Sequence, residues 1–332
     1  MTQPELEHGK DVLLFYEEFE RDSFFTHDRY LKRLLRPIYH RFTRKRKVSG
    51  FLVWLRLLDK ALRRQGYRVH LNRYALARRN PAYPVGIVGY PYILERWMLP
   101  NPVLLGPGMY DHPKLAPGLF GDPRYRRLIL TCDWVYDMFR PWYGEHCVKW
   151  HAGIDTAEWP DSRGREKTLD VLVYDKILFG RELRSEELLR PVLDHLAARG
   201  LSHEVLRYRR HDHGTYRRSL ERARSMVFLC EHETQGLAYQ EAMACNVPIV
   251  AWDNGYWRDP VSVELQLPPV PASSVPFFAP ECGERFREAT AFPAAFDRLW
   301  GNLAAYSPRA YVLRELSLDG SGEAYAKIYF AL

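Results

Sequence analysis

The sequence predicts an α/β protein with two parallel sheets, and two observations carry this prediction. Short apolar runs alternate with amphipathic segments along most of the 332 residues, which is typical of parallel strands covered by helices on both faces. The alternation pauses in a turn-like stretch at 151–168, rich in Pro, Gly, Asp and charged residues, and then restarts. Each half is about 150 residues long, which is enough for a domain with its own core.

The first half shows one clear amphipathic helix between short apolar runs. Leucines recur at helical spacing through Ser49–Gly66, and Gly66 is a plausible stop. The strands expected in this half are Asp11–Tyr16, Tyr67–Asn72, Val85–Tyr90, Pro102–Gly108 and Arg127–Cys132.

The second half repeats the alternation more regularly. Its expected strands are Leu169–Asp175, His203–Tyr208, Met226–Cys230 and Val247–Trp252. Its expected helices are Ser185–Gly200, Thr215–Ser225 and Thr234–Cys245, and the tail from 291 to 332 is expected to be helical. "HDHG" at 211–214 resembles a metal-binding pair, but we interpret it as the capping turn of the helix that follows.

Composition narrows the classes of protein. Five cysteines at irregular spacing, without C-x-x-C, argue against a disulfide framework or a zinc site and favour a reducing cytoplasm. The first residues lack the pattern of a signal peptide, and no apolar run approaches the ~18–20 residues of a spanning helix. We therefore expect a cytoplasmic protein, with attachment at the inner membrane face left open.

Charge is distributed unevenly along the chain. The window from Asp28 to Arg79 holds 17 Lys and Arg against two acids, a charge of +15, which leaves −8 for the rest of a chain whose total is +7. Its densest part, "KRLLRPIYHRFTRKRK", interleaves apolar and basic residues and ends with Arg44, Lys45, Arg46 and Lys47. A solvated surface and attachment to an anionic membrane both fit this pattern. Nucleic-acid binding fits less well, because no recognisable module is present.

The stretch "EHETQGLAYQEAMACNVPIVAW" at 231–252 carries the clearest chemistry. It places a loop and a helix directly after a buried strand, where ligands bind in parallel α/β sheets. A helix N-terminus offers free amides to a phosphate, and Gly236 allows close approach of a ligand to the backbone. The carboxylates of Glu233 and Glu241 suit sugar or ribose hydroxyls. Asn246 is expected in the left-handed turn that ends the helix.

This segment resembles the signature of glycosyltransferase family 4, retaining transferases of GT-B fold. Glu233 and Glu241 have the Glu-x7-Glu spacing, and "EAMACNVPIVA" matches with Asn246 where the family has Gly. Looser similarities are "HAGID" at 151–155, "LDVLVYDKILFGRE" at 169–182, and Gly50 in an N-terminal glycine loop. The match covers about 25 residues strongly, the C-terminal half well, and the N-terminal half by pattern only.

The resemblance implies a GT-B protein: two Rossmann-like parallel-sheet domains facing a cleft. The implied limits are an acceptor domain at 1–152 with a basic insertion near 28–48, a donor domain at 153–305, and C-terminal helices at 306–332 packing back toward the first domain. The implied reaction transfers a sugar from a nucleotide diphosphate donor, such as a UDP- or GDP-sugar, with retention of configuration and without a metal or other cofactor. The acceptor is open, and a lipid-linked or anionic one fits the basic insertion.

The resemblance also implies roles for individual residues. Glu241 would hold the ribose, Glu233 would contact the donor sugar, and backbone amides of Gln235, Gly236 and Leu237 would touch the sugar or the diphosphate. Lys176 and Arg181 would neutralise the departing nucleotide, although the family order of Arg then Lys is reversed here. A histidine near the donor sugar would be His112 or, as the alternative, His151.

Three other functions remain open on the sequence alone. A nucleotide-sugar epimerase or a phosphorylase can use the same fold, although no phosphate or pyridoxal site of a phosphorylase is recognisable. A non-catalytic protein that binds a nucleotide sugar or an anionic surface is the alternative outside the enzymes.

Overall fold

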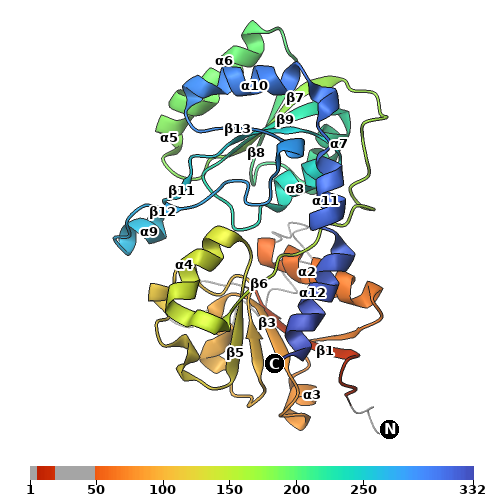
Figure 1. Cartoon of the computed structure of the whole chain (residues 1–332), viewed down its shortest axis with the longest axis vertical. Coiled ribbons are helices and arrows are strands. Elements are labelled where there is room, and N and C mark those ends of the chain that lie inside the picture. The colour runs from red at the N-terminus through yellow and green to blue at the C-terminus, as the bar shows by residue number, and fades with distance from the viewer. Residues whose placement is uncertain (1–5, 19–48) are drawn as a thin grey trace, which may run out of the picture. The chain divides into compact units, whose positions relative to one another are not determined.

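The structure, a computed structural model, describes residues 6–18 and 49–332 (Figure 1). It divides into two compact units, residues 1–129 with 323–332, and residues 130–322. The predicted basic insertion at 28–48, with Arg44, Lys45, Arg46 and Lys47, lies entirely outside the described residues. The domain limits expected from the sequence, at 152/153 and 305/306, differ from these divisions. They stay a prediction of where the acceptor domain, the donor domain and the C-terminal helices meet.

The first sheet has six strands in the order β2-β1-β3-β4-β5-β6. The pairs β1–β2, β1–β3, β3–β4 and β4–β5 are parallel. The strands are β1 (Asp11–Glu17), β2 (Arg68–Leu71), β3 (Val85–Gly89), β4 (Val103–Leu105), β5 (Tyr125–Leu130) and β6 (Cys147–Lys149). Among the described residues, the α-helices in this part of the chain are α2 (Gly50–Arg64), α3 (Tyr74–Arg79) and α4 (Asp133–Tyr143).

The helix α2 forms as its sequence predicts. Ser49 caps it by accepting a hydrogen bond from the Leu52 amide at 3.2 Å. Gly66 follows its end with φ +85°, a conformation in which side chains with a Cβ are strained. One face of the helix is buried, and this face consists of Trp54, Leu55, Leu58, Ala61 and Leu62.

The second sheet has five parallel strands in the order β13-β10-β9-β7-β8. They are β7 (Leu169–Lys176), β8 (His203–Arg207), β9 (Ala223–Cys230), β10 (Ile249–Trp252) and β13 (Gly283–Phe286), with a small antiparallel pair β11 (Tyr256–Trp257) and β12 (Val270–Pro271). The helices are α5 (Arg181–Arg184), α6 (Arg190–Ala198), α7 (His213–Arg222), α8 (Leu237–Ala244), α9 (Pro260–Glu264), α10 (Phe292–Trp300), α11 (Pro308–Glu315) and α12 (Leu318–Phe330).

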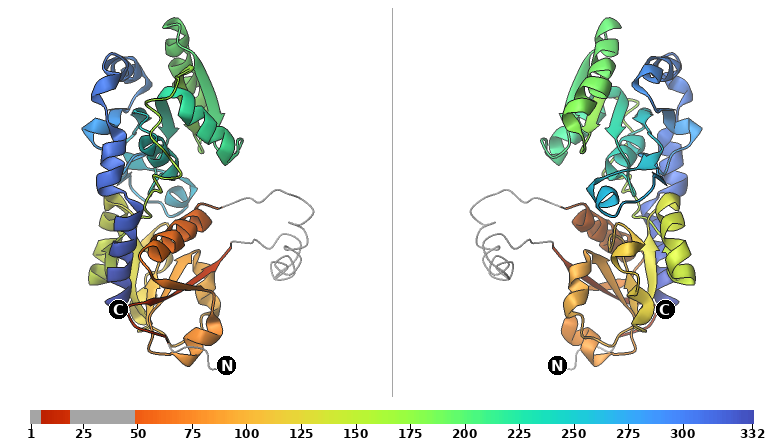
Figure 2. Two further views of the ribbon diagram at one scale, coloured as in Figure 1. Left: turned by 90° about the vertical axis from the view of Figure 1, so that its right-hand side faces the viewer. Right: turned by 90° about the vertical axis from the view of Figure 1, so that its left-hand side faces the viewer.

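Helices cover both faces of the second sheet, as Figures 1 and 2 show. Alternate residues of each strand point to opposite faces, so that Leu172 and Tyr174 lie in one apolar core and Val171 and Val173 in the other. The first core includes residues of α7, α8 and α11, and the second includes residues of α6 and α10. This is the arrangement that the alternating pattern predicts, and the α/β prediction with parallel sheets is confirmed.

The structure differs from the sequence-based predictions in two elements and agrees with them in a third. The helix expected at Thr215–Ser225 ends at Arg222, because Ala223 already begins β9 and pairs with Leu169. The short strand β13, with only four residues, went unrecognised. Asp212 does cap α7, accepting a hydrogen bond from the Thr215 amide at 2.7 Å, so the capping role expected of "HDHG" is confirmed.

Among the described residues, no helix is both long and apolar enough to span a bilayer.

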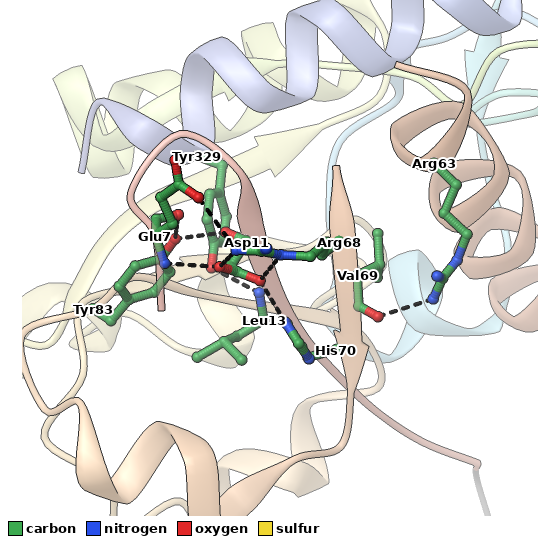
Figure 3. A network of polar contacts seen from close by, with 9 residues as sticks. All are labelled: Glu7, Asp11, Leu13, Arg63, Arg68, Val69, His70, Tyr83 and Tyr329. Atoms are coloured by element: carbon green, nitrogen blue, oxygen red, sulfur yellow. Dashed lines mark hydrogen bonds and ion pairs between the residues drawn. The ribbon is translucent and has the colours of Figure 1, made fainter. Parts of the chain in front are cut away.

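A polar network fixes the start of the first unit (Figure 3). The buried Asp11 carboxylate accepts hydrogen bonds from Arg68 Nη2 at 2.6 Å and from the Glu7 amide at 2.7 Å, and lies 2.7 Å from His70 Nε2. Nearby, the Tyr329 hydroxyl accepts a hydrogen bond from the Leu13 amide at 2.9 Å. The last residues of α12 are thereby attached to β1.

Candidate active site

The candidate site lies at the topological switch point of the second sheet, where the chain stops adding strands on one side of β7 and begins to add them on the other. The chain runs from β7 outward to β8 and then returns to β9 on the other side of β7. In sheets of this order, the carboxyl ends of the two central strands border a crevice in which ligands bind. Lys176 is the last residue of β7 and pairs in register with Cys230, the last residue of β9. The segments after these two residues therefore lie at the position where a ligand is expected in a sheet of this order.

Lys176 and Glu233 meet at this point and form an ion pair. The two side chains are only 16% and 11% exposed, so water screens their attraction weakly. Burial opposes the charge on Lys176, but Glu233, Cys230 and Tyr208 outweigh burial and raise the pKa of the ammonium. The Tyr208 ring lies against it, with Nζ 4.8 Å from the ring centre. The sequence singled out both members of this pair, although not their contact.

The loop after β7 holds two more charged contacts. Arg181 is paired with the buried Asp175, whose Oδ1 accepts a hydrogen bond from Arg181 Nη1 at 2.8 Å. The Glu231 carboxylate accepts hydrogen bonds from the amides of Leu178 and Phe179, both at 2.9 Å. The sequence did not identify Asp175 and Glu231 as site residues, although Asp175 lies one residue before Lys176 and Glu231 two residues before Glu233.

Glu241 lies on α8 with only 13% of its side chain exposed. Its Oε1 is 3.9 Å from Nε2 of His213, the first residue of α7. Burial raises the pKa of the Glu241 carboxyl, against the opposing effect of His213, and the carboxylate in turn raises the pKa of His213. The contact between His213 and Glu241 gave no signal in the sequence, because the two residues come from different helices.

One buried ring links the two glutamates. Burial raises the pKa of the Tyr174 hydroxyl, and Glu241 and Glu233 raise it further while Lys176 lowers it. The structure thus brings Lys176 and Glu233 together at the end of β7, while Glu241 lies on α8 with His213 as its nearest charged partner.

The N-terminus of α8 is rigidly held. Gly236 adopts φ +83° directly before the helix. The Gln235 side chain accepts a hydrogen bond from the Ala152 amide at 3.0 Å, and it donates to the Ala152 carbonyl at 2.6 Å and to Gln240 Oε1 at 3.2 Å. Only the backbone amides of Gln235, Gly236 and Leu237 therefore remain as candidates for ligand contact, as expected, and this role stays a prediction.

The other end of α8 is equally well defined. Asn246 has φ +65°, and its amide donates to the Met243 carbonyl at 2.9 Å, which confirms the left-handed turn predicted there. The Arg309 guanidinium donates to the Ala244 carbonyl and, at 2.7 Å, to that of Trp159. This contact satisfies a carbonyl that the helix geometry leaves without an intrahelical partner.

The two candidate histidines lie in different places. His151 belongs to the second unit, next to Ala152, with its ring against Phe277 and its Nε2 3.2 Å from the Glu315 carbonyl. His112 belongs to the first unit and is buried, and its Nδ1 accepts a hydrogen bond from the Lys114 amide at 3.0 Å. Burial lowers the pKa of both imidazoles.

Comparison with known proteins gives the fold. No model of a protein family matches the sequence, and no curated protein does. The catalytic domain of starch synthase IV from Arabidopsis thaliana, bound to ADP and acarbose, is similar with a TM-score of 0.58 at 10% identity, over 97% of this chain and 99% of that one. Sucrose-phosphate synthase from Thermosynechococcus elongatus is similar with a TM-score of 0.56 at 12% identity, over 96% and 98%.

The glycosyltransferase AviGT4, involved in avilamycin A biosynthesis, is similar over 96% of this chain and 97% of that one, with a TM-score of 0.53 at 12% identity. The fold is GT-B. This confirms the fold expected from the resemblance at 231–252. At such low identities the likeness establishes the GT-B fold alone, and the roles of the site residues stay predictions.

Proposed function

We propose that this GT-B chain transfers a sugar from a nucleotide diphosphate donor to an acceptor, with retention of configuration. The observation that carries the proposal is the ion pair of Lys176 with Glu233 at the switch point of the second sheet, directly before the helix α8 that carries Glu241. A cation and two carboxylates are the groups that a diphosphate flanked by two polyhydroxylated rings requires.

The chemistry follows from the charge that develops during transfer. When the bond between sugar and diphosphate breaks, negative charge grows on the nucleotide, and a fixed cation in a water-poor site stabilises it. Lys176 is such a cation, since it is largely buried and its pKa is raised. Arg181 and the amides at the start of α8 add to this stabilisation. The reaction then needs no metal.

The similar structures support this class of ligand. That of starch synthase IV contains ADP and acarbose. That of Staphylococcus aureus TarM, with a TM-score of 0.53 at 11% identity, contains UDP and α-GlcNAc-glycerol. Retention is supported by the Glu-x7-Glu spacing of Glu233 and Glu241, which resembles that of retaining transferases.

The decisive experiment incubates the protein with a panel of UDP-, GDP- and ADP-sugars and candidate acceptors, and measures nucleotide release. The proposal expects release with one donor, in EDTA as well as without it, and a product whose anomeric configuration, measured by NMR, equals that of the donor. Binding without release under all conditions would instead support the non-catalytic alternative. Conversion of the donor sugar without transfer would support an epimerase.

The acceptor side is proposed to work at an anionic membrane surface in the cytoplasm. The charge of +15 between Asp28 and Arg79 supports this proposal, because each basic residue near anionic lipid adds about 1 kcal/mol of binding free energy. The described part of this window includes α2, with Arg63 and Arg64 in its last turn. A lipid-linked acceptor would be presented at the same surface.

A further inference from the structure

The anion-binding groups that follow β7 are engaged by the chain's own carboxylates. Lys176 is paired with Glu233, and Arg181 with Asp175. The amides of Leu178 and Phe179 donate to Glu231. Within the described part of the chain, each group that would hold a diphosphate at the end of β7 thus has an internal competitor.

The pair of Lys176 and Glu233 differs from the other two contacts. Asp175, on β7, is 1% exposed and also accepts a hydrogen bond from the Ile177 amide at 3.2 Å, so the loop that follows the strand fixes it. Glu231 is bound by two amides of that loop. Glu233, in contrast, belongs to the segment leading to α8, and the contacts of its carboxylate are with Lys176 and, at 3.7 Å, the Cys230 thiol. Of the three carboxylates, it depends most on a single cation.

We propose that Glu233 competes with phosphate for Lys176, and that this competition makes the site select an intact nucleotide sugar over the free nucleoside diphosphate. The inference rests on the proposed function and deepens it, because it assigns to one ion pair the discrimination between substrate and product.

The selection follows from what each ligand supplies. A free nucleoside diphosphate takes Lys176 from Glu233 and leaves a largely buried carboxylate without its cation, which is costly. A nucleotide sugar also takes Lys176, but its sugar hydroxyls donate hydrogen bonds to Glu233 in exchange. Only the intact donor satisfies both members of the pair.

The same exchange assists product release. After the sugar has left for the acceptor, Glu233 loses its hydroxyl partners while Lys176 still holds the diphosphate. Re-formation of the ion pair then displaces the nucleoside diphosphate. No covalent bond is made or broken and no proton moves in this step, because the ammonium of Lys176 passes from one anion, the diphosphate, to another, Glu233.

The test compares wild type with Glu233→Gln by calorimetry, using UDP, GDP and ADP and the corresponding nucleotide sugars. Wild type is expected to bind its nucleotide sugar at least roughly tenfold tighter than the free nucleoside diphosphate. In Glu233→Gln, affinity for the free nucleoside diphosphate should rise about tenfold, since Lys176 is released from its carboxylate. The preference for the nucleotide sugar should disappear.

The control variant is Glu284→Gln, which removes another carboxylate of the same unit, paired with Arg298 at 2.9 Å. It should bind both ligands as wild type does. Should Glu233→Gln fail to fold, Glu233→Asp withdraws the carboxylate from Lys176 by one methylene and should shift affinities in the same direction.

The outcomes separate this inference from the function on which it rests. Nucleotide binding that is lost in Glu241→Ala but not strengthened in either Glu233 variant refutes the competition alone. Absence of nucleotide binding in wild type and in every variant refutes the donor site itself.

Discussion

Gly236 lies directly against the ring of Tyr239, and the turn into α8 depends on this contact. A Cβ at position 236 would fall inside the van der Waals radius of the Tyr239 ring, which is fully buried, and the backbone there has φ +83°. The protein's own packing thus requires glycine at this position, whereas the sequence suggested only the approach of a ligand.

The first prediction concerns this glycine. Gly236→Ala should lower the free energy of unfolding by about 1–3 kcal/mol, because it adds both backbone strain and overlap with a buried ring. It should also weaken donor binding by shifting the amides at the start of α8. Gly164→Ala is the matched control, since a Cβ there meets nothing within 4 Å and its φ is ordinary. Equal urea midpoints for the two variants would contradict the prediction.

The second prediction concerns Glu241. Glu241→Ala should weaken donor binding by about ten- to a hundredfold, as expected when a ligand loses one or two hydrogen bonds to a charged acceptor. Calorimetry with the nucleotide sugar measures the loss, and Glu284→Ala serves as the control. Wild-type donor affinity in Glu241→Ala would remove this residue from the site.

The third prediction separates the two histidines. His112→Ala should lower kcat roughly a hundredfold with nucleotide affinity unchanged, as expected for a group that acts on the donor sugar during transfer. His151→Ala should leave kcat within about twofold, since its imidazole contacts the Glu315 carbonyl and the Phe277 ring. Loss of turnover in His151→Ala alone would transfer the role to that residue.

The fourth prediction concerns acid stability of the first unit. Burial opposes the charge of Asp11, but Arg68, His70 and the Glu7 amide outweigh it and lower the pKa of the carboxyl from 3.8 to about 2. The charged form therefore stabilises the folded state above the unfolded-state pKa, and this stability is lost as pH falls toward 2. The shift corresponds to about 2 kcal/mol.

Urea unfolding of wild type and Asp11→Asn at neutral pH and near pH 2 measures this contribution. The variant should be less stable at neutral pH by about 2 kcal/mol, and the difference should shrink in acid. A difference that stays constant across this range would show that the Asp11 charge does not contribute.

The fifth prediction concerns the basic segment. Replacing Arg44, Lys45, Arg46 and Lys47 by Ser should reduce sedimentation with vesicles that contain anionic lipid and leave donor binding unchanged. Loss of four charges removes up to about 4 kcal/mol of attraction to such a surface. Unchanged sedimentation would exclude these residues as the membrane contact, and neutral vesicles are the control for non-electrostatic binding.

The sequence predicted the central strands of both sheets for a physical reason. The strands β1 and β3 of the first sheet and β7, β9 and β10 of the second are buried along most of their length, so they appear as apolar runs. The end of α8 was predictable because its Asn-x-Pro turn is recognisable. The strand β13 was not predicted, because "GERF" carries charges at two of its four positions and does not form an apolar run. Such charges suit a strand at the edge of a sheet.

The sequence predicted several residues of the candidate site but not the contacts between them. Lys176, Glu233 and Glu241 follow from spacing and from their place after strands. The pairings of Arg181 with Asp175 and of Glu241 with His213 depend on which carboxylate lies nearest to each cation in space. No local pattern encodes such pairings, because they join different strands, loops and helices.

The register between Lys176 and Cys230 has a consequence for folding. These two strand ends lie far apart in the chain, with β8 and α7 between them, so the site exists only once the central strands have found each other. A fragment that contains only one of these two strands therefore lacks part of the site. Ligand binding should consequently slow hydrogen exchange most strongly in the amides of β7 and β9, even where they lie remote from the ligand.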